Sequence, residues 1–263
     1  MKEEQTSAPA NLTWLEVGAG DTSRRIAVID EPGDPNRPGL FWLGGFKSSM
    51  LGEKATALAT FAKDRDISST RFDYSGHGLS EGSFEDGTIS AWLEEAEAVF
   101  QQVTSGPQIL IGSSMGGWIA LLLARALGSE RIHAIALIAP AWDMTERLMW
   151  ARFPDELKTE ILGTGYHDRP SAYGDGDYRI TLGLIEDGRN HLIGGHPMEL
   201  GCPIHILHGR DDPDVPLAHG LGLIDHLPHD EVLVTIVPDG DHRLSRPQDI
   251  ALLLRILEAL SGA

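Results

Sequence analysis

The sequence has little cysteine, a shortage of cations and no long apolar run. Its single cysteine, Cys202, excludes a disulfide within the chain and a cysteine-rich zinc site. The 21 Lys and Arg residues are outnumbered by 39 Asp and Glu, which gives a formal net charge of -18. Nucleic acid and anionic membrane surfaces would repel such a chain, so we expect neither as a partner. No apolar run reaches the length of a membrane span.

The N-terminus carries no recognisable targeting signal. Met1 to Gln5 contains two glutamates and lacks the basic and apolar regions of a secretory signal. Early glutamates also disfavour a mitochondrial presequence. We therefore expect a cytoplasmic enzyme or binding protein.

Strand-like and helix-like segments alternate along most of the 263 residues, a length that suits a single α/β domain. The expected strands are 12–17, 24–30, 40–43, 67–73, 107–111, 131–139, 203–208 and 231–237. The expected helices are 50–64, 89–103, the segment ending at Leu127, 217–227 and 248–260. This alternation predicts a doubly wound, mostly parallel sheet. Residues 141–199 interrupt it after the sixth strand with clustered aromatics and broken helices, but with no convincing strand. We expect them to form a helical lid on a core made of 1–140 and 200–263.

An apolar strand runs into Gly112-Ser113-Ser114-Met115-Gly116 and leaves as an apolar helix. This Gly-x-Ser-x-Gly pattern is typical of a nucleophile elbow, in which a tight turn exposes the serine hydroxyl at the end of a sheet. The positions two before and two after the serine must be very small, and only Ser114 has glycine at both. The alternative is an ordinary glycine-rich turn with an incidental serine.

A serine needs a base to take its proton and an acid to orient that base. In an open α/β sheet these partners should follow later strands, because ligands bind at the carboxyl ends of the strands. His242 follows the last expected strand, and His208-Gly209-x-x-Asp212-x-x-Val215-Pro216 selects Asp212 as the acid. The remaining candidate acids are Asp143, Asp211 and Asp214. We interpret the other histidines of this region (His208, His219, His226 and His229) as strand-end, surface or capping residues.

The oxyanion of a tetrahedral intermediate needs two hydrogen-bond donors. We expect the backbone N–H of Met115, at the start of the helix, and the N–H of Phe46, after Gly44-Gly45. The alternative for the two glycines is a tight turn alone. Gly45, Trp142, Trp150 and Phe153 are candidates for the substrate pocket, although core packing is the commoner fate of such aromatics. His191, His196 and His205 have no carboxylate or Cys partner at the spacing of metal ligands, so we expect no metal.

Several motifs resemble those of the α/β-hydrolase superfamily. They are Gly112 to Gly117, the motif from His208 to Pro216, and Asp241-His242. Arg71-Phe72-Asp73-Tyr74-Ser75-Gly76-x-Gly78-x-Ser80, Gly116-Gly117-Trp118 and Phe153-Pro154-x-Glu156-Leu157-Lys158 are similar to a branch of small serine hydrolases. That branch includes a mitochondrial acyl-protein thioesterase that also cleaves acyl glucuronides. The sequence departs from the branch at Gly44-Gly45, where His-Gly is frequent, in a glycine-rich and acidic lid between Gly163 and Asp187, and in having no basic targeting segment.

The resemblance implies a cofactor-free serine hydrolase with Ser114, Asp212 and His242 as its triad and a lid over an acyl pocket. It implies a small-molecule carboxylic ester or thioester as substrate. Other reactions on the same triad, namely carbon–carbon bond hydrolysis, peptide cleavage and perhydrolysis, stay open. A non-catalytic binding protein of the same fold is the alternative from a different class. Haloalkane and epoxide hydrolysis are disfavoured, because they would need a carboxylate at position 114.

Overall fold

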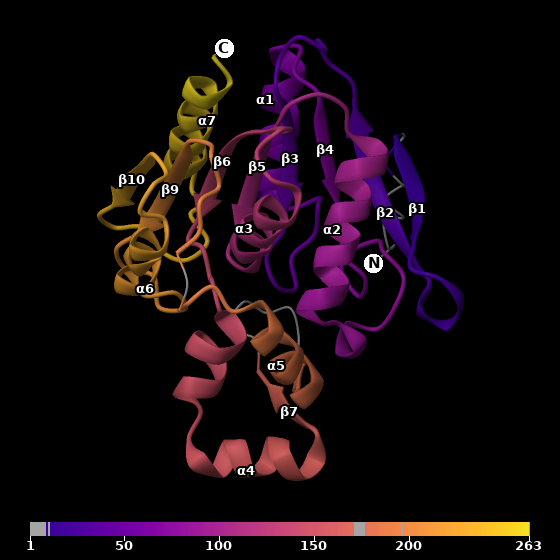
Figure 1. The fold of residues 1–263 in the computed structure, drawn as a ribbon, viewed down its shortest axis with the longest axis vertical. Coiled ribbons are helices and arrows are strands. Elements are labelled where there is room, and N and C mark those ends of the chain that lie inside the picture. The colour runs from indigo at the N-terminus through magenta and orange to yellow at the C-terminus, as the bar shows by residue number, and fades with distance from the viewer. Residues whose placement is uncertain (1–8, 10, 171–176, 196, 263) are drawn as a thin grey trace, which may run out of the picture.

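The protein is built around one eight-stranded sheet (Figure 1). The computed structural model describes residues 9, 11–170, 177–195 and 197–262. The strands are β1 (Leu12–Val17), β2 (Arg24–Glu31), β3 (Gly39–Leu43), β4 (Ser69–Phe72), β5 (Gln108–Ser113), β6 (Ile132–Ile138), β9 (Ile204–Gly209) and β10 (Val232–Val237). They lie in the order β1-β2-β4-β3-β5-β6-β9-β10. The pairs β1–β2 and β2–β4 are antiparallel and the rest are parallel, which confirms the predicted fold class.

Helices cover both faces of the sheet, and each face has its own apolar core. In β3, Phe41 and Leu43 face a core shared with α2 (Ile89–Val103) and α3 (Met115–Leu127). Leu40 and Trp42 face the opposite core, shared with α1 (Glu53–Asp64) and α7 (Pro247–Ser261). Alternate residues of a strand point to opposite faces, so a strand buried on both sides reads as a continuous apolar run. Among the described residues, no helix is long and apolar enough to cross a membrane.

Several element boundaries differ from the prediction. Helix α1 begins at Glu53 rather than Met50, because Met50 is held outside the helix by its backbone N–H, which donates to Asp73 Oδ1 at 2.6 Å. The expected helix 217–227 divides into α6 (Leu217–Gly222) and the 3₁₀ turn η6 (Leu223–His226). Short 3₁₀ turns η1 (Gly20–Thr22) and η2 (Phe84–Asp86) lie in loops.

Residues 139–203, here called the insertion, connect β6 to β9 and extend below the sheet in Figure 1. They contain η3 (Met144–Met149), η4 (Trp150–Arg152), α4 (Asp155–Thr164), β7 (Tyr166–Arg169), β8 (Tyr178–Thr181), α5 (Leu182–Gly188) and η5 (Arg189–His191). The expectation of no strand here is wrong, because β7 and β8 form an antiparallel pair. Both are four residues long and β7 is largely exposed, so neither shows the apolar alternation that marks a strand. Polar contacts support the pair instead, including Arg179 Nε to Asp168 Oδ1 at 2.8 Å.

Candidate active site

Ser114 occupies a strained turn between β5 and α3. Its φ of 55° and ψ of -118° lie where a residue with a side chain is rarely found. Such a conformation persists only when the surroundings enforce it, and here two glycines do. A Cβ added to Gly112 would overlap the carbonyl oxygen of Gly116, and a Cβ added to Gly116 would overlap that of Leu43. The local geometry is therefore that expected of a nucleophile elbow.

His242 joins Ser114 to Asp212 across three segments that lie far apart in the sequence. Its Nε2 is 2.9 Å from Ser114 Oγ, and its Nδ1 is 2.8 Å from Asp212 Oδ2. The histidine follows β10, and the buried aspartate follows β9. The other carboxylate oxygen, Oδ1, accepts hydrogen bonds from the N–H groups of Asp214 and Val215 at 2.9 and 2.8 Å. With Nδ1–H donating to the carboxylate, Nε2 is left as the acceptor for the serine hydroxyl.

The remaining candidate acids, Asp143, Asp211 and Asp214, occupy different positions in the structure. Asp143 is buried, and its carboxylate accepts from the N–H groups of Ile193 and Gly194 at 2.6 and 2.8 Å, so it fixes that turn of the insertion. Asp211 is exposed on the loop after β9. Asp214 lies at the wall of the cavity beside Ser114, where its N–H supports Asp212.

Two further histidines are packed near the acid. His208 is fully buried, and burial lowers its pKa; its Nε2 lies 2.9 Å from Val215 O and 3.6 Å from Asp212 Oδ2. His219 stacks on Trp142 with ring centroids 4.6 Å apart, and its Nε2 lies 2.9 Å from Trp142 O. Burial lowers the pKa of His219 to about 4. Both imidazoles are therefore neutral at pH 7, and they hold the segments around the site.

The expected oxyanion donors border the elbow. Met115 is the first residue of α3, so its N–H belongs to the helical turn whose amides have no partner within the helix. Phe46 lies in a turn closed by Ser48, whose N–H and Oγ donate to Gly45 O at 3.1 and 2.7 Å. A Cβ on Gly45 would lie 3.2 Å from Ser113 O, so this loop packs directly against the elbow.

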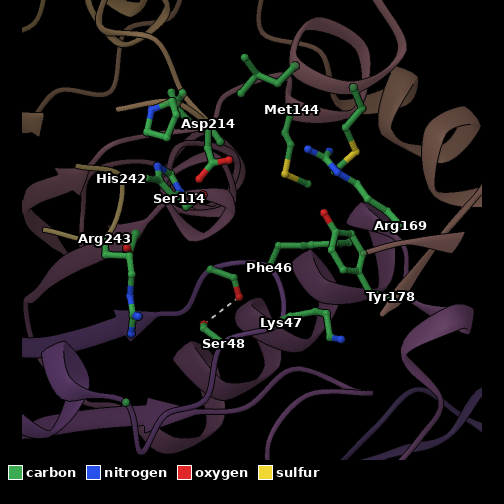
Figure 2. Close-up of a pocket in the computed structure, with 18 of the residues that line it drawn as sticks. Phe46, Lys47, Ser48, Ser114, Met144, Arg169, Tyr178, Asp214, His242 and Arg243 are labelled. Carbon is green, nitrogen blue, oxygen red and sulfur yellow. Dashed lines mark hydrogen bonds between the residues drawn. The ribbon is translucent and has the colours of Figure 1, made fainter. Parts of the chain in front are cut away.

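A cavity of about 710 Å³ opens onto Ser114 and His242 (Figure 2). Of the predicted pocket residues, Gly45 and Phe153 line it, and so does Phe46, the predicted oxyanion donor. Trp142 and Trp150 do not. Trp142 is buried in the core with its Nε1–H donating to His219 O at 2.8 Å, and Trp150 packs beside Phe153.

Most of the apolar lining comes from methionine and leucine side chains of the insertion. They are Met144, Leu148, Met149 and Leu157, with Val215 from the core. The aromatic residues of the sequence did not indicate this lining. The spacing of Met144 and Leu148, together with the adjacent Met149, was the available signal. It was weak, because the same spacing describes any buried helical turn.

Cations gather at this cavity although the chain is strongly acidic. Lys47, Lys54, Arg152, Arg169 and Arg243 line it, against the acids Glu53 and Asp214. Lys54 donates to Arg243 O and, at 3.2 Å, to Ser245 Oγ. Burial, and next the charge of Arg243, lowers the pKa of Lys54 to about 8.

A serine at a strand-to-helix elbow, followed in the chain by an aspartate and a histidine after later strands of a mostly parallel sheet, defines the α/β-hydrolase class. The model of the alpha/beta hydrolase family matches residues 38–251, and the chain belongs to that family.

The chain is 33% identical over 257 residues to the human "Palmitoyl-protein thioesterase ABHD10, mitochondrial", covering 94% of this chain and 83% of that protein. A solved structure of a putative hydrolase from Agrobacterium vitis S4 shares 43% identity, with a TM-score of 0.92 and coverage of 97% of this chain and 100% of that one. The structure of mouse alpha/beta hydrolase domain-containing protein 10 shares 32% identity, with a TM-score of 0.85 and coverage of 95% and 98%. The predicted resemblance is thereby confirmed.

The names of the mammalian relatives place those proteins in mitochondria. They give no support to the predicted cytoplasmic location, which stays a prediction. The N-terminal residues on which that prediction depended lie outside the described part of the chain.

Proposed function

We propose that this α/β hydrolase cleaves carboxylic esters or thioesters through an acyl-enzyme, with Ser114 as nucleophile, His242 as general base and acid, and Asp212 as the orienting acid. The observation that supports this most directly is the continuous hydrogen-bonded arrangement from Ser114 Oγ through His242 to Asp212. The names of the relatives support a thioester as one substrate.

In the acylation step, His242 Nε2 takes the hydroxyl proton while Ser114 Oγ attacks the acyl carbonyl carbon. Asp212 fixes the tautomer of His242 and stabilises the imidazolium that forms. The carbonyl oxygen becomes an oxyanion, for which the N–H groups of Met115 and Phe46 are the proposed donors.

Collapse of this intermediate breaks the bond to the leaving group, which receives the proton from His242 Nε2. Water then attacks the acyl-enzyme as His242 takes its proton, and the carboxylic acid is released. No group beyond these side chains, the two backbone amides and water is required.

Within the insertion, residues 141–199 are proposed to act as a lid over a core formed by 1–140 and 200–263. The π-helical segment η3 and helix α4 supply much of the apolar wall of the cavity. That wall suits an apolar acyl portion, because burying alkyl surface contributes about 25 cal/mol per Å².

The test compares three proteins on short p-nitrophenyl esters and acyl thioesters: wild type, Ser114→Ala and Ser113→Ala. Ser113 is the matched control, since it is the adjacent serine at the end of β5. We expect Ser114→Ala to lose turnover and labelling by a fluorophosphonate probe, while Ser113→Ala retains both. Equal turnover in wild type and Ser114→Ala would refute the assignment. If the probe labels the wild-type protein but no ester or thioester is cleaved, the result would favour carbon–carbon bond hydrolysis, peptide cleavage or perhydrolysis.

A further inference from the structure

The cations that line the cavity are not equivalent. Lys54 donates to Arg243 O and to Ser245, and Arg152 Nη1 lies 3.4 Å from Asp214 O. Arg169, at the end of β7, also lines the cavity. Its side chain makes no such hydrogen bond to another described residue, and no described carboxylate forms an ion pair with it.

Arg169 and the hydroxyl of Tyr178 lie together on one side of the site. Figure 2 shows His242 on one side of Ser114 and these two groups on the other, with Met144 between Ser114 and Arg169. Arg169 and Tyr178 are register partners across β7 and β8, so the hairpin presents them jointly. Burial raises the pKa of Tyr178, which keeps its hydroxyl protonated and able to donate. Lys47 Nζ adds a positive charge 5.3 Å from the centroid of the Tyr178 ring.

We propose that Arg169 and Tyr178 form a subsite for a carboxylate at the far end of the acyl group, so that preferred substrates are esters or thioesters of dicarboxylic acids. This inference rests on the proposed function and names its substrate class. A guanidinium fork matches a carboxylate in geometry and charge, and a phenol hydroxyl supplies a further donor.

The position of Arg169 and Tyr178 relative to His242 decides which part of the substrate bears the negative charge. The leaving group must lie near His242 Nε2, from which it receives its proton, so the acyl chain extends away from that histidine. Arg169 and Tyr178 are on that far side. Met144 lies along the way and suits the methylene part of the chain.

Asp214 does not distinguish the two ends of the site. One of its carboxylate oxygens lies within 4.8 Å of a ring nitrogen of His242, and its charge also contributes to the raised pKa of Tyr178. Arg243 also lines the cavity on that side, but Figure 2 shows its guanidinium directed away from Ser114. The cations Arg169 and Lys47, which line the cavity with Tyr178, therefore favour an anion at the acyl end.

The experiment measures kcat/KM for three substrates of matched length: an unsubstituted alkanoyl thioester, its ω-carboxy counterpart from adipoyl to sebacoyl, and an alkanoyl ester of an anionic alcohol. We expect wild type to prefer the ω-carboxy substrate. Arg169→Met should lower the ratio of ω-carboxy to unsubstituted kcat/KM by about tenfold to a hundredfold, as expected for loss of a charge-assisted hydrogen bond. Arg169→Glu should lower it further and favour an ω-ammonium acyl group.

Arg189→Met is the matched control, because it removes one positive charge from the insertion at a residue that does not line the cavity. Its ratio should equal that of wild type. The proposal is overturned if wild type shows no preference for the ω-carboxy group, if Arg169→Met leaves the ratio unchanged, or if only the anionic alcohol is preferred. In those cases the unsubstituted thioester is still cleaved and the proposed function stands. If wild type and Ser114→Ala cleave all three substrates equally, the proposed function itself fails.

Discussion

The two walls of the cavity are built in different ways. On the core wall, Ser114, Asp212 and His242 follow strands of the central sheet, and backbone contacts leave little freedom around them. On the insertion wall, short helices and a two-stranded hairpin carry the lining residues, supported by surface ion pairs such as Arg179–Asp168 and Arg189–Glu146. Exposed ion pairs contribute little stability. We therefore propose that the core wall determines the reaction and the insertion wall determines the substrate.

The largest expected effect separates two buried aspartates, Asp212 in the core and Asp143 in the insertion. Asp212→Asn should lower kcat by about four orders of magnitude, because an amide facing Nδ1 favours the wrong tautomer of His242. Asp143→Asn should retain the chemical step, since Asp143 bonds the N–H groups of Ile193 and Gly194, but should lose about 1–3 kcal/mol of stability. Steady-state kinetics and urea unfolding of both variants distinguish the two roles. Similar kcat values for the two would remove the distinction between the walls.

A pair of helical glycines provides the next comparison. Gly116→Ala places a Cβ against the carbonyl of Leu43, and we expect loss of several kcal/mol together with loss of activity. Gly163→Ala, in α4 of the insertion, meets nothing within 4 Å. Because alanine is the better helix former, that variant should gain about 0.5–1 kcal/mol. Thermal unfolding measures both, and a tolerated Gly116→Ala would contradict the tight contact described for the elbow.

His77 gives a prediction for the pH dependence of stability. It is buried among Tyr74, Phe84 and Trp92, and burial lowers its pKa to about 4. The unfolded chain, with a histidine pKa near 6.5, binds more protons than the native state between these values. The free energy of unfolding should therefore fall as the pH drops from about 6.5 to 4, by up to about 3 kcal/mol from this residue.

The His77→Asn variant should reduce that slope, because an Asn amide can replace Nδ1–H, the group positioned 3.0 Å from Ser75 O, but does not titrate. His229→Asn, at an exposed histidine, is the matched control and should keep the wild-type slope. Urea unfolding at a series of pH values measures all three proteins. An unchanged slope in His77→Asn would show that another group is responsible.

The smallest effect concerns two leucines of α4. Leu157 lines the cavity, and Leu162 is 61% exposed. Leu157→Ala should lower kcat/KM for long acyl chains by about tenfold, in line with the loss of a few methylene contacts, and should affect short chains less. Leu162→Ala should leave chain-length preference unchanged. A chain-length series of thioesters provides the measurement, and equal behaviour of the two variants would argue against the proposed lid.

The same contrast explains what the sequence could predict. The elbow requires glycine at two fixed offsets, and its partners must follow later strands, so backbone geometry confines Ser114, Asp212 and His242 to recognisable positions. The choice of Asp212 over Asp143 depended on a motif, and it agrees with the hydrogen bond to His242. No comparable constraint acts on the insertion.

Its large aromatics were the natural candidates for the pocket, yet Trp142 is engaged by His219 and the cavity is lined by methionines and leucines. The strands β7 and β8 escaped prediction because both are four residues long, β7 is largely exposed, and β8 buries Ile180 alone of its four residues. A side chain's direction in such a segment depends on packing between elements, which periodicity within one element does not report.

The absence of a side chain at Gly116 has a consequence for how the protein can change over time. Since helix α3, which follows Ser114, rests on the main chain at the end of β3, the separation between Ser114 and the Phe46 loop is a distance between two backbones. Amino-acid replacements elsewhere alter side chains and leave that spacing intact. Residues of the insertion can therefore change while the distance between Ser114 and the Phe46 loop stays the same. New substrate preferences can arise in this way without a change in the geometry around Ser114.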